Sequence, residues 1–385
     1  MPVIVQINTQ ADPRTAVGGI MHAISRGVSA VDFDSRIVAG YGWRAYSNLV
    51  LESKTRYVAY ALRHRRYGDD GFITGEPTRR LLRYLDSMRP DIVHLHNMHG
   101  YYLDMPALTA WLSRNGTRVV ATLHDLWWLT GRCASPGDCP VNPDGRSGCE
   151  NCRFPKYYPS VSRSLAPRYK AEFLAPLNAG LVVPSEAMAE IVRKSVLSHL
   201  PLTVIGNGVD KDVFKPEGPE IKLRGDVKLL AVSANWNPLK NPAALQRLAQ
   251  AMPEGWHLTI VGEGSGVRGR NVSRWPQVKR RDTLAALYRS ADVLLSPSLS
   301  ESFGITVAEA NACGIPAIVN SEAVPAIRAV SGNVIRAPFS EPAAVIDGIR
   351  QTLASATAVS PALVRSSADM SADYLRLYRQ ILSAE

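Results

Sequence analysis

The sequence predicts an α/β protein with two domains, each built on a doubly wound parallel sheet. The chain has 385 residues, which is too long for one comfortable core and suits two domains of roughly 150 to 200 residues each. Short apolar runs rich in β-branched residues recur along it, and a helix-like stretch follows each run. Continuous hydrophobic strands that alternate with helices are typical of parallel sheets covered on both faces.

Ten apolar runs are expected to be strands. The first half contributes PVIVQIN, SRIVAG, DIVHLHN, TRVVATLHD and AGLVVPS, and the second contributes VKLLAVS, HLTIVGEG, DVLLSPS, PAIVNS and GNVIRA. Between the halves, VIGNGVDKDVFKP contains glycine, asparagine and proline residues that break regular structure. We therefore predict an N-terminal domain over residues 1–205 and a C-terminal domain over residues 206–364.

The last segment, residues 365–385, predicts a closing helix. Its apolar residues recur at helical spacing, and we expect this helix to pack back on the N-terminal domain. They are Met370, Tyr374, Leu375, Tyr378 and Ile381.

Composition and charge narrow the class of protein. Hydrophobic residues make up 46% and charged residues 20% of the chain, as in ordinary globular proteins, and no apolar run approaches the roughly 18 residues of a membrane span. The start of the sequence shows no secretory pattern, so we expect a cytoplasmic protein. No zinc-finger, RNA-recognition or helix-turn-helix signature occurs, so we expect no nucleic-acid partner.

The formal net charge of +10 is concentrated in one region. Residues 41–90 hold ten Lys or Arg side chains against five acids. A solvated helix face is one interpretation of this basic region. Peripheral contact with anionic headgroups at the inner face of a membrane is the other.

Polar residues follow several of the predicted strands. In open parallel sheets, ligands bind outside the carboxyl ends of the strands. DIVHLHNMHG places His94, His96 and His99 at one such end, and TLHD places His124 and Asp125 at the next. Any single histidine could instead be a satisfied core residue. His124, followed at once by Asp125, is the better functional candidate.

The segment ESFGITVAE carries Glu301 and Glu309 on either side of Gly304. It follows the strand DVLLSPS and predicts a turn at Gly304 and then a helix that ends at Gly314. Free N–H groups and the dipole at a helix start favour an anion such as phosphate. The two carboxylates would flank that phosphate and accept hydrogen bonds from hydroxyl groups. The competing interpretation is a loop glutamate and a surface helix glutamate.

This segment, together with EANACGIPAIV, resembles the signature of the family 4 glycosyltransferases. These enzymes have the GT-B fold, in which two Rossmann-like domains face each other across a cleft. The resemblance implies that Glu301 binds hydroxyl groups of a donor sugar and that Glu309 binds a ribose. It also implies that backbone groups around Gly304 to Thr306 hold the phosphate of the donor, and it places Phe303 and Ile305 among the donor-binding residues.

The resemblance extends over most of the chain. TAVGGIMHAIS, with Gly18 and Gly19, resembles the glycine loop that faces the donor diphosphate, and VIGNGVDKDVFKP resembles the interdomain stretch. DIVHLHN and TLHD resemble strand ends of the acceptor domain, which gives His124 the role of a histidine near the hydroxymethyl group of the sugar. The further acceptor-site candidates are His99, Tyr101, Asp125 and Trp127. For some of them, core packing is the alternative.

One position departs from the family pattern. The family usually has Arg five residues before a Lys, and both neutralise the diphosphate, whereas SANWNPLK gives Asn235 and Lys240. Asparagine donates hydrogen bonds but supplies no charge. Lys240 remains a candidate phosphate ligand, and Asn241-Pro242 predicts the start of a helix beside it. Whether another cation replaces the missing arginine is open, and the candidates are Arg14, Arg280 and Arg281.

The resemblance implies a retaining transfer of a sugar, of the hexosyltransferase type, from a nucleotide diphosphate sugar. The acceptor would be a saccharide or a lipid-linked molecule in polysaccharide or glycoconjugate biosynthesis. His124, Glu301 and Lys240 are the expected catalytic residues, and neither an enzyme nucleophile nor a catalytic metal is expected. A nucleotide-sugar epimerase on the same fold and a non-catalytic sugar-nucleotide binding module are the alternatives.

Four cysteines lie in a Pro- and Gly-rich insertion over residues 131–159. Tetrahedral zinc suits such a loop, and a reducing cytoplasm disfavours disulfides. Disulfides, a redox pair and free thiols are the alternatives. A subset of family 4 enzymes of polysaccharide synthesis has a similar insertion. With four protein ligands the zinc would be structural, held by Cys133, Cys139, Cys149 and Cys152.

Overall fold

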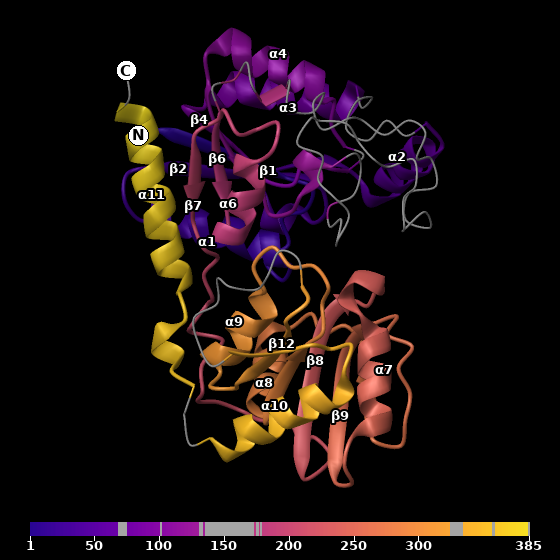
Figure 1. The fold of residues 1–385 in the computed structure, drawn as a ribbon. Helices are drawn as coiled ribbons and strands as arrows, with labels where there is room; N and C mark the ends of the chain where they lie inside the picture. Colours follow the sequence, from indigo (N-terminus) through magenta and orange to yellow (C-terminus); the bar gives the residue numbers. More distant parts are fainter. Residues whose placement is uncertain are drawn as a thin grey trace. The chain divides into compact units, whose positions relative to one another are not determined.

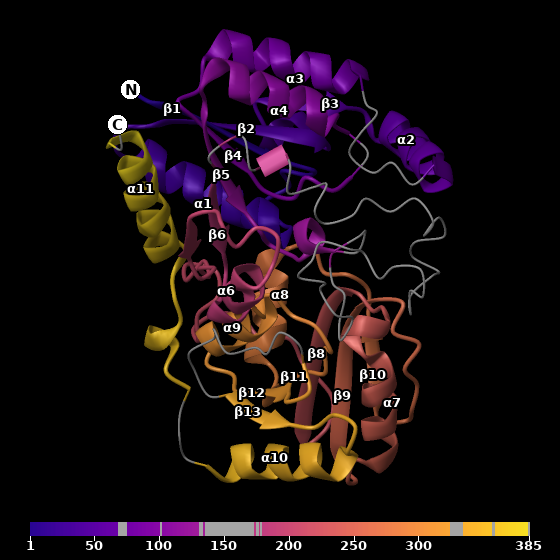
Figure 2. The ribbon, with the colours of Figure 1, turned by 45° about the horizontal axis from the view of Figure 1, so that its top comes forward.

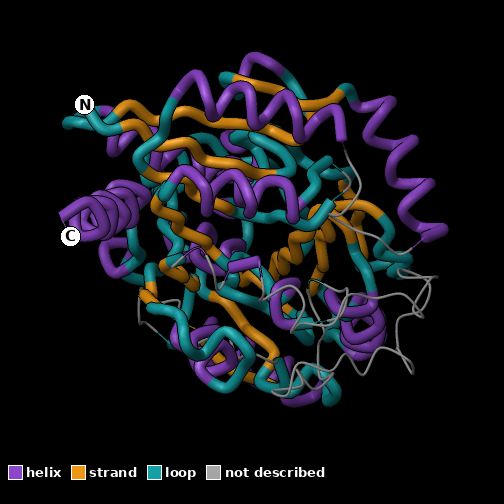
Figure 3. The backbone as a smooth tube through the Cα atoms, turned by 90° about the horizontal axis from the view of Figure 1, so that it is seen from above, coloured by secondary structure: helices purple, strands orange, loops and turns teal. Residues whose placement is uncertain are grey.

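A computed structural model describes most of the chain, which falls into two compact units. Unit 1 comprises Met1–Gly206 with Ala368–Glu385, and unit 2 comprises Asn207–Ser367. Helices and strands alternate along both units (Figures 1 and 3). The residues described are 1–67, 75–100, 102–130, 134, 173–174, 177, 179–323, 334–355 and 359–383.

Unit 1 contains a seven-stranded sheet in the order β3-β2-β1-β4-β5-β6-β7, and all of its pairings are parallel. Its helices are α1 (Ala16–Ser29), α2 (Lys54–Tyr67), α3 (Gly75–Met88), α4 (Met105–Asn115), α6 (Glu186–Arg193) and α11 (Ser367–Ser383). Its strands are β1 (Val3–Asn8), β2 (Asp34–Tyr41), β3 (Leu49–Glu52), β4 (Ile92–Leu95), β5 (Arg118–Thr122), β6 (Gly180–Val183) and β7 (Leu202–Val204).

Unit 2 contains a six-stranded parallel sheet in the order β10-β9-β8-β11-β12-β13. Its helices are α7 (Pro242–Ala251), α8 (Arg281–Arg289), α9 (Ile305–Ala312) and α10 (Pro342–Ala354). Its strands are β8 (Val227–Asn235), β9 (Trp256–Glu263), β10 (Val272–Trp275), β11 (Val293–Ser296), β12 (Ala317–Asn320) and β13 (Val334–Ala337).

Alternate residues of the strands enter different cores, as expected for a sheet covered on both faces. In β8, Leu230 packs in the core that contains α8 and α9, whereas Leu229 and Ala231 pack in the core that contains α7 and α10. These four helices are seen in Figure 2. In β1, Ile4 shares a core with α1 and α11, whereas Val5 faces the core of α3 and α4.

All ten predicted strands are present, and the described part of the chain contains three more strands that the prediction missed. β3, β7 and β10 are edge strands of three or four residues. Strands this short have no long apolar run, and β7 and β10 are largely exposed or half-buried. These three strands are recognised by the strands with which they pair, and no local sequence pattern predicts them.

The closing helix predicted at the end of the chain is α11. Met370, Tyr374 and Tyr378 are buried in the core that α11 shares with Ile24 of α1 and Val120 of β5. The C-terminal segment is therefore part of unit 1. No helix in the described part of the chain is both long and apolar enough to cross a membrane.

Candidate active site

The sheet of unit 2 has a topological switch point between β8 and β11. The chain continues from β8 to β9 on one side, and β11 then pairs with β8 on the other side. Because the strands are parallel, both end at the same edge, where open α/β sheets bind ligands. The loops that leave these two strands carry Lys240 and Glu301.

Lys240 and Glu301 form an ion pair, with Nζ of the lysine donating to Oε1 of the glutamate. Asn237 holds the lysine loop, because its Oδ1 accepts from the amides of Leu239, at 2.9 Å, and Lys240, at 3.1 Å. The two loops are joined directly by Leu299 N, which donates to Leu239 O at 2.8 Å. Lys240 and Glu301 therefore lie at the carboxyl edge of the sheet, in two loops that are hydrogen-bonded to each other.

Asn241 caps α7, as Asn241-Pro242 predicted. It adopts a left-handed conformation with φ 52°, and its side chain accepts from Ala244 N. A lysine just before a helix start is unfavourable next to the positive end of the dipole. The carboxylate of Glu301 offsets that cost.

The predicted turn at Gly304 leads into α9. Gly304 has φ 92°, and no side chain among the described residues caps the helix. The first helical bonds come from Val307 N and Ala308 N to Gly304 O, so Ile305 and Thr306 keep the orphan amides of a helix start. Phe303 is buried in the core of unit 2. Its ring is thus an anchor for the turn, and any donor contact from this residue would come from its backbone.

Glu309 lies one turn into α9 and is partly buried. Burial raises the pKa of Glu309 to about 7, while nearby Arg281 and a hydrogen bond from Tyr288 act in the opposite direction. Tyr288 Oη donates to Oε2 of Glu309 at 3.1 Å. Burial also raises the pKa of Tyr288 well above its ordinary value, so this donor keeps its proton. Glu309 can therefore exist in either protonation state near neutral pH.

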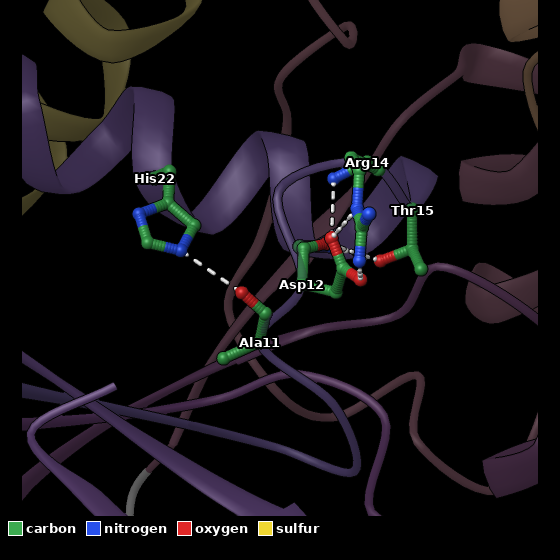
Figure 4. A network of polar contacts seen from close by, with 6 residues as sticks. Ala11, Asp12, Arg14, Thr15 and His22 are labelled. Atoms are coloured by element: carbon green, nitrogen blue, oxygen red, sulfur yellow. Dashed lines mark hydrogen bonds and ion pairs between the residues drawn. The ribbon is translucent and has the colours of Figure 1, made fainter. Parts of the chain in front are cut away.

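The three arginines considered as substitutes for the missing charge all pair with aspartates of their own unit. Arg280 Nη2 contacts Asp282 Oδ2 at 2.5 Å, and Arg281 Nη1 lies 3.7 Å from Asp210 Oδ2. Arg14 contacts Asp12 at 2.6 Å (Figure 4). Asn235 itself is exposed at the end of β8. The structure thus identifies no uncommitted arginine among these three.

The glycine loop expected at Gly18 and Gly19 is instead the first turn of α1. The amide of Gly18 donates to Thr15 Oγ1 at 3.2 Å, and the amide of Gly19 donates to Thr15 O at 2.8 Å. A Cβ on Gly18 would lie 2.0 Å from Asp12 O, so this glycine is required for close packing of the preceding loop. Figure 4 shows that loop, in which Asp12 also binds Arg14.

In unit 1, Gln6, His96 and His124 form a buried chain of hydrogen bonds. His96 Nδ1 lies 2.9 Å from His124 Nε2, and His96 Nε2 lies 3.1 Å from Gln6 Oε1. Burial lowers the pKa of His124 to about 4 and that of His96 well below its ordinary value. Both rings are therefore neutral at pH 7. His124 stands at the carboxyl end of β5, the type of position predicted for a ligand-binding residue.

His94 belongs to a second network, which ties the sheet to α11. Its Nδ1 lies 2.6 Å from Tyr378 Oη and its Nε2 lies 2.7 Å from Thr122 Oγ1. Thr122 in turn contacts Tyr374 Oη at 3.0 Å. His94 is thus a satisfied core histidine.

The acceptor-site candidates differ in their surroundings: two of them contact each other and another is buried in the core. His99 Nε2 contacts Asp125 Oδ2 at 2.9 Å, and Asp125 Oδ1 accepts from Trp127 N at 3.0 Å. Trp127 is only 2% exposed and packs in the core of unit 1, which favours the packing interpretation, and its acceptor role stays a prediction. Tyr101 lies outside the described residues.

The four cysteines predicted to bind zinc lie outside the described residues. Within the described part of the chain, no group of three or more His, Cys, Asp or Glu side chains could hold a metal ion. The zinc hypothesis stays a prediction. Cys313 is buried.

Sequence reasoning missed Gln6 and Tyr288. Gln6 is fully buried in β1, and its polar side chain within the apolar run VIVQIN was a usable signal. Tyr288 lies in α8 and meets Glu309 only through tertiary packing, so no local pattern identifies it.

Two Rossmann-like parallel units define the GT-B class of folds. The fold is similar to that of sucrose-phosphate synthase from Thermosynechococcus elongatus, with a TM-score of 0.64, 16% identity and all of both chains covered. It is also similar to a glycosyltransferase from Rickettsia africae ESF-5, with a TM-score of 0.64 and 14% identity over 100% of this chain and 99% of the other. An Anabaena protein solved in complex with UDP and glucose gives a TM-score of 0.57 at 12% identity, covering 99% of this chain and 97% of the other. These likenesses concern the fold.

The sequence family described as Glycosyltransferase Family 4 matches residues 22–213, and Glycosyl transferases group 1 matches residues 227–355. The chain belongs to the family 4 glycosyltransferases. The resemblance seen in the ESFGITVAE segment is confirmed.

Curated relatives include D-inositol 3-phosphate glycosyltransferases. The protein of that name from Xylanimonas cellulosilytica is 29% identical over 59% of this chain and 55% of its own length. The one from Mycobacteroides abscessus is 35% identical over 30% of this chain and 31% of its own length. The chain thus matches about half or less of the length of these relatives.

Proposed function

We propose that the protein is a retaining glycosyltransferase that moves a sugar from a nucleotide diphosphate sugar to a saccharide or lipid-linked acceptor. The reaction would serve polysaccharide or glycoconjugate biosynthesis. The observation that carries this proposal is the Lys240–Glu301 pair beside the uncapped start of α9, at the switch point of unit 2. Family membership supports the same reaction class.

The switch point suits a diphosphate and the sugars on either side of it. Lys240 has three N–H donors and uses one on Glu301, so the others can bind phosphate together with the amides of Ile305 and Thr306. Donors fixed in this way stabilise the charge that grows on the leaving group. Glu301 would accept hydrogen bonds from the donor sugar, and Glu309 would accept them from the ribose.

The retaining reaction needs no enzyme nucleophile. The acceptor hydroxyl attacks the anomeric carbon on the face from which the nucleotide departs, the bond from that carbon to the phosphate oxygen breaks, and the departing phosphate takes the acceptor's proton. His124 would bind a hydroxyl group of the sugar. Its neutral ring is consistent with that role.

Nucleotide release with candidate acceptors tests this function. UDP-, GDP- and dTDP-sugars are supplied with acceptors, starting with UDP-glucose and inositol phosphates because of the ligands named for the similar proteins. Lys240→Ala and Glu301→Ala should each abolish transfer. Lys228→Ala is the matched control, because Lys228 pairs with Asp292 at 3.8 Å in the same unit. Full activity of either site variant contradicts the assignment.

The same assay separates the two alternatives. An epimerase would convert the donor sugar without acceptor, and a binding module would bind the nucleotide sugar without turnover. Transfer to the acceptor together with nucleoside diphosphate release excludes both.

The second part of the proposal is that the basic region, residues 41–90, contacts an anionic lipid surface. Trp43, Val58 and Leu62 are 72%, 48% and 64% exposed. Val58 and Leu62 lie one turn apart on α2, among the exposed cations Lys54, Arg56 and Arg63. Apolar side chains among cations suit the interface of an anionic membrane.

A structural zinc bound by Cys133, Cys139, Cys149 and Cys152 completes the proposal. Metal analysis of the folded protein tests it, and four free thiols without metal would contradict it.

A further inference from the structure

We infer that His96, held by Gln6, is a positioning residue that sets the tautomer of His124, so that His124 offers a bare Nδ1 to a hydroxyl group of the substrate. The identity of that substrate rests on the proposed function. The tautomer itself follows from contacts within unit 1.

The side-chain amide of Gln6 determines which ring nitrogen of His96 carries the proton. Its Nε2 donates to Met21 O and to Ser35 Oγ, each at 3.2 Å. Because the amide nitrogen is used there, its Oε1 is the atom that faces His96 Nε2 at 3.1 Å. A carbonyl oxygen only accepts, so His96 carries a proton on Nε2.

The position of the proton on His96 determines the position of the proton on His124. A neutral imidazole with its proton on Nε2 has a lone pair on Nδ1. His96 Nδ1 lies 2.9 Å from His124 Nε2, so it accepts a hydrogen bond from that nitrogen. Neutrality of His96 is supported by its complete burial and by His94, whose ring centroid lies 4.0 Å from that of His96.

His124 then has one nitrogen left for a ligand. Its Nε2 proton is used on His96, and its Nδ1 has no hydrogen-bond partner among the residues that the structure describes. Asp125 favours the charged form of His124 and His99 opposes it, but burial exceeds both and keeps the ring neutral. A neutral Nδ1 accepts a hydrogen bond from a hydroxyl group and has no proton to donate to a phosphate or carbonyl oxygen.

The tautomer can be read without substrate. In protein labelled with ¹⁵N-histidine, a long-range ¹H–¹⁵N correlation spectrum distinguishes protonated from bare ring nitrogens, and loss of signals in His124→Gln assigns the ring. We expect the proton of His124 on Nε2 at pH 7. A proton on Nδ1 overturns the inference, whatever the variants do.

Variants of the chain test the positioning role. His96→Leu should redistribute the His124 proton over both nitrogens, and His96→Asn should restore it to Nε2, because the asparagine oxygen can replace the acceptor. His257→Gln is the control, since His257 belongs to unit 2 and contacts Ser273 there. It should leave the His124 signals unchanged. An unchanged tautomer in folded His96→Leu contradicts the role of His96.

An activity readout then links the tautomer to the substrate. His96→Leu should lower kcat/KM at least tenfold, with recovery in His96→Asn. A deoxy donor that lacks the recognised hydroxyl should make the wild type and His96→Leu equal. If the protein transfers no sugar at all, the proposed function fails while the spectrum still decides the tautomer. If transfer occurs and no deoxy donor reduces the difference between the two proteins, the hydroxyl contact is wrong.

Discussion

Nζ of Lys240 binds Oε1 of Glu301, and this contact joins the loops after two neighbouring strands of unit 2. The cation expected to bind the phosphate is therefore partly neutralised within the chain. The carboxylate expected to bind the sugar is the partner that neutralises it. Phosphate binding by Lys240 and sugar binding by Glu301 are therefore coupled.

Glu301→Gln should bind a nucleoside diphosphate more tightly while losing transfer. Removing the carboxylate charge frees Lys240 for the anion, and a partly exposed ion pair of this kind is worth about 1 kcal/mol, or roughly fivefold in affinity. Lys240→Ala should weaken the same binding. Calorimetric titration measures both, and weaker binding by Glu301→Gln would show that the pair does not compete with the ligand.

Asn235→Arg should increase affinity for the nucleoside diphosphate, and the increase should shrink with added salt. Asn235 is exposed at the end of β8, where an arginine would add a charge near the switch point. Asn235→Gln is the neutral control. Equal affinities of the arginine variant and the wild type would show that this position carries no deficit of charge.

Glu309 should make the protein less stable as pH rises from about 4.5 to 7. Its pKa is about 7 in the folded state, against the ordinary 4.5 expected for the same side chain once unfolding exposes it, so the folded state retains a proton that the unfolded chain has released. Below pH 4.5 both forms are protonated and the effect vanishes. Urea unfolding of the wild type and Glu309→Gln across this range measures it, with an expected difference on the order of 1–2 kcal/mol. Parallel pH profiles of the two proteins would contradict the buried carboxyl group.

The buried histidines should act in the opposite direction. The pKa values of His94, His96 and His124 all lie below the ordinary 6.5, that of His124 at about 4. The unfolded chain therefore binds protons that the folded protein does not, and stability falls as pH drops below about 6.5. His124→Gln should reduce this slope between pH 6.5 and 4, whereas His257→Gln should reduce it less because His257 is only partly desolvated. Equal slopes in the wild type and His124→Gln would mean that His124 is charged in the folded protein.

Vesicle binding tests the lipid surface. Leu62→Ser and Trp43→Ala should each weaken sedimentation with anionic vesicles by roughly threefold or more, since each removes an apolar side chain from the interface. Leu363→Ser is a matched control, because Leu363 and Leu62 are both 64% exposed and Leu363 lies in unit 2. Equal losses for Leu62→Ser and Leu363→Ser would argue against a specific surface on α2.

Local patterns predicted the parts of the fold that depend on nearby residues. The turn at Gly304, the cap at Asn241 and the closing helix with Tyr374 all follow from residues within a few positions. The resemblance implied a glycine loop at Gly18, whereas the structure places Gly18 in the first turn of α1. Gly18 packs closely against Asp12 O, a contact that only the folded structure reveals. A role of Gly18 toward the donor stays a prediction.

Long-range pairing defined the rest of the candidate site. Lys240 and Glu301 are 61 residues apart, and His96 and Gln6 are 90 residues apart. Each residue could be selected by type, yet no spacing in the sequence shows that it meets the other. The direction of the hydrogen bonds along Gln6, His96 and His124 likewise requires the neighbours of Gln6, which lie on α1 and β2.

The placement of α11 in unit 1 has a consequence for synthesis of the protein on the ribosome. Tyr374 and Tyr378 close the hydrogen-bond network of His94 and Thr122, so unit 1 remains unfinished until α11 has been made, although its sheet precedes unit 2 in the sequence. A nascent chain that stops at Ser367 would lack the α11 side chains that share a buried core with Ile24 and Val120. Unit 2, which is continuous in sequence, can complete its core earlier than the unit that precedes it.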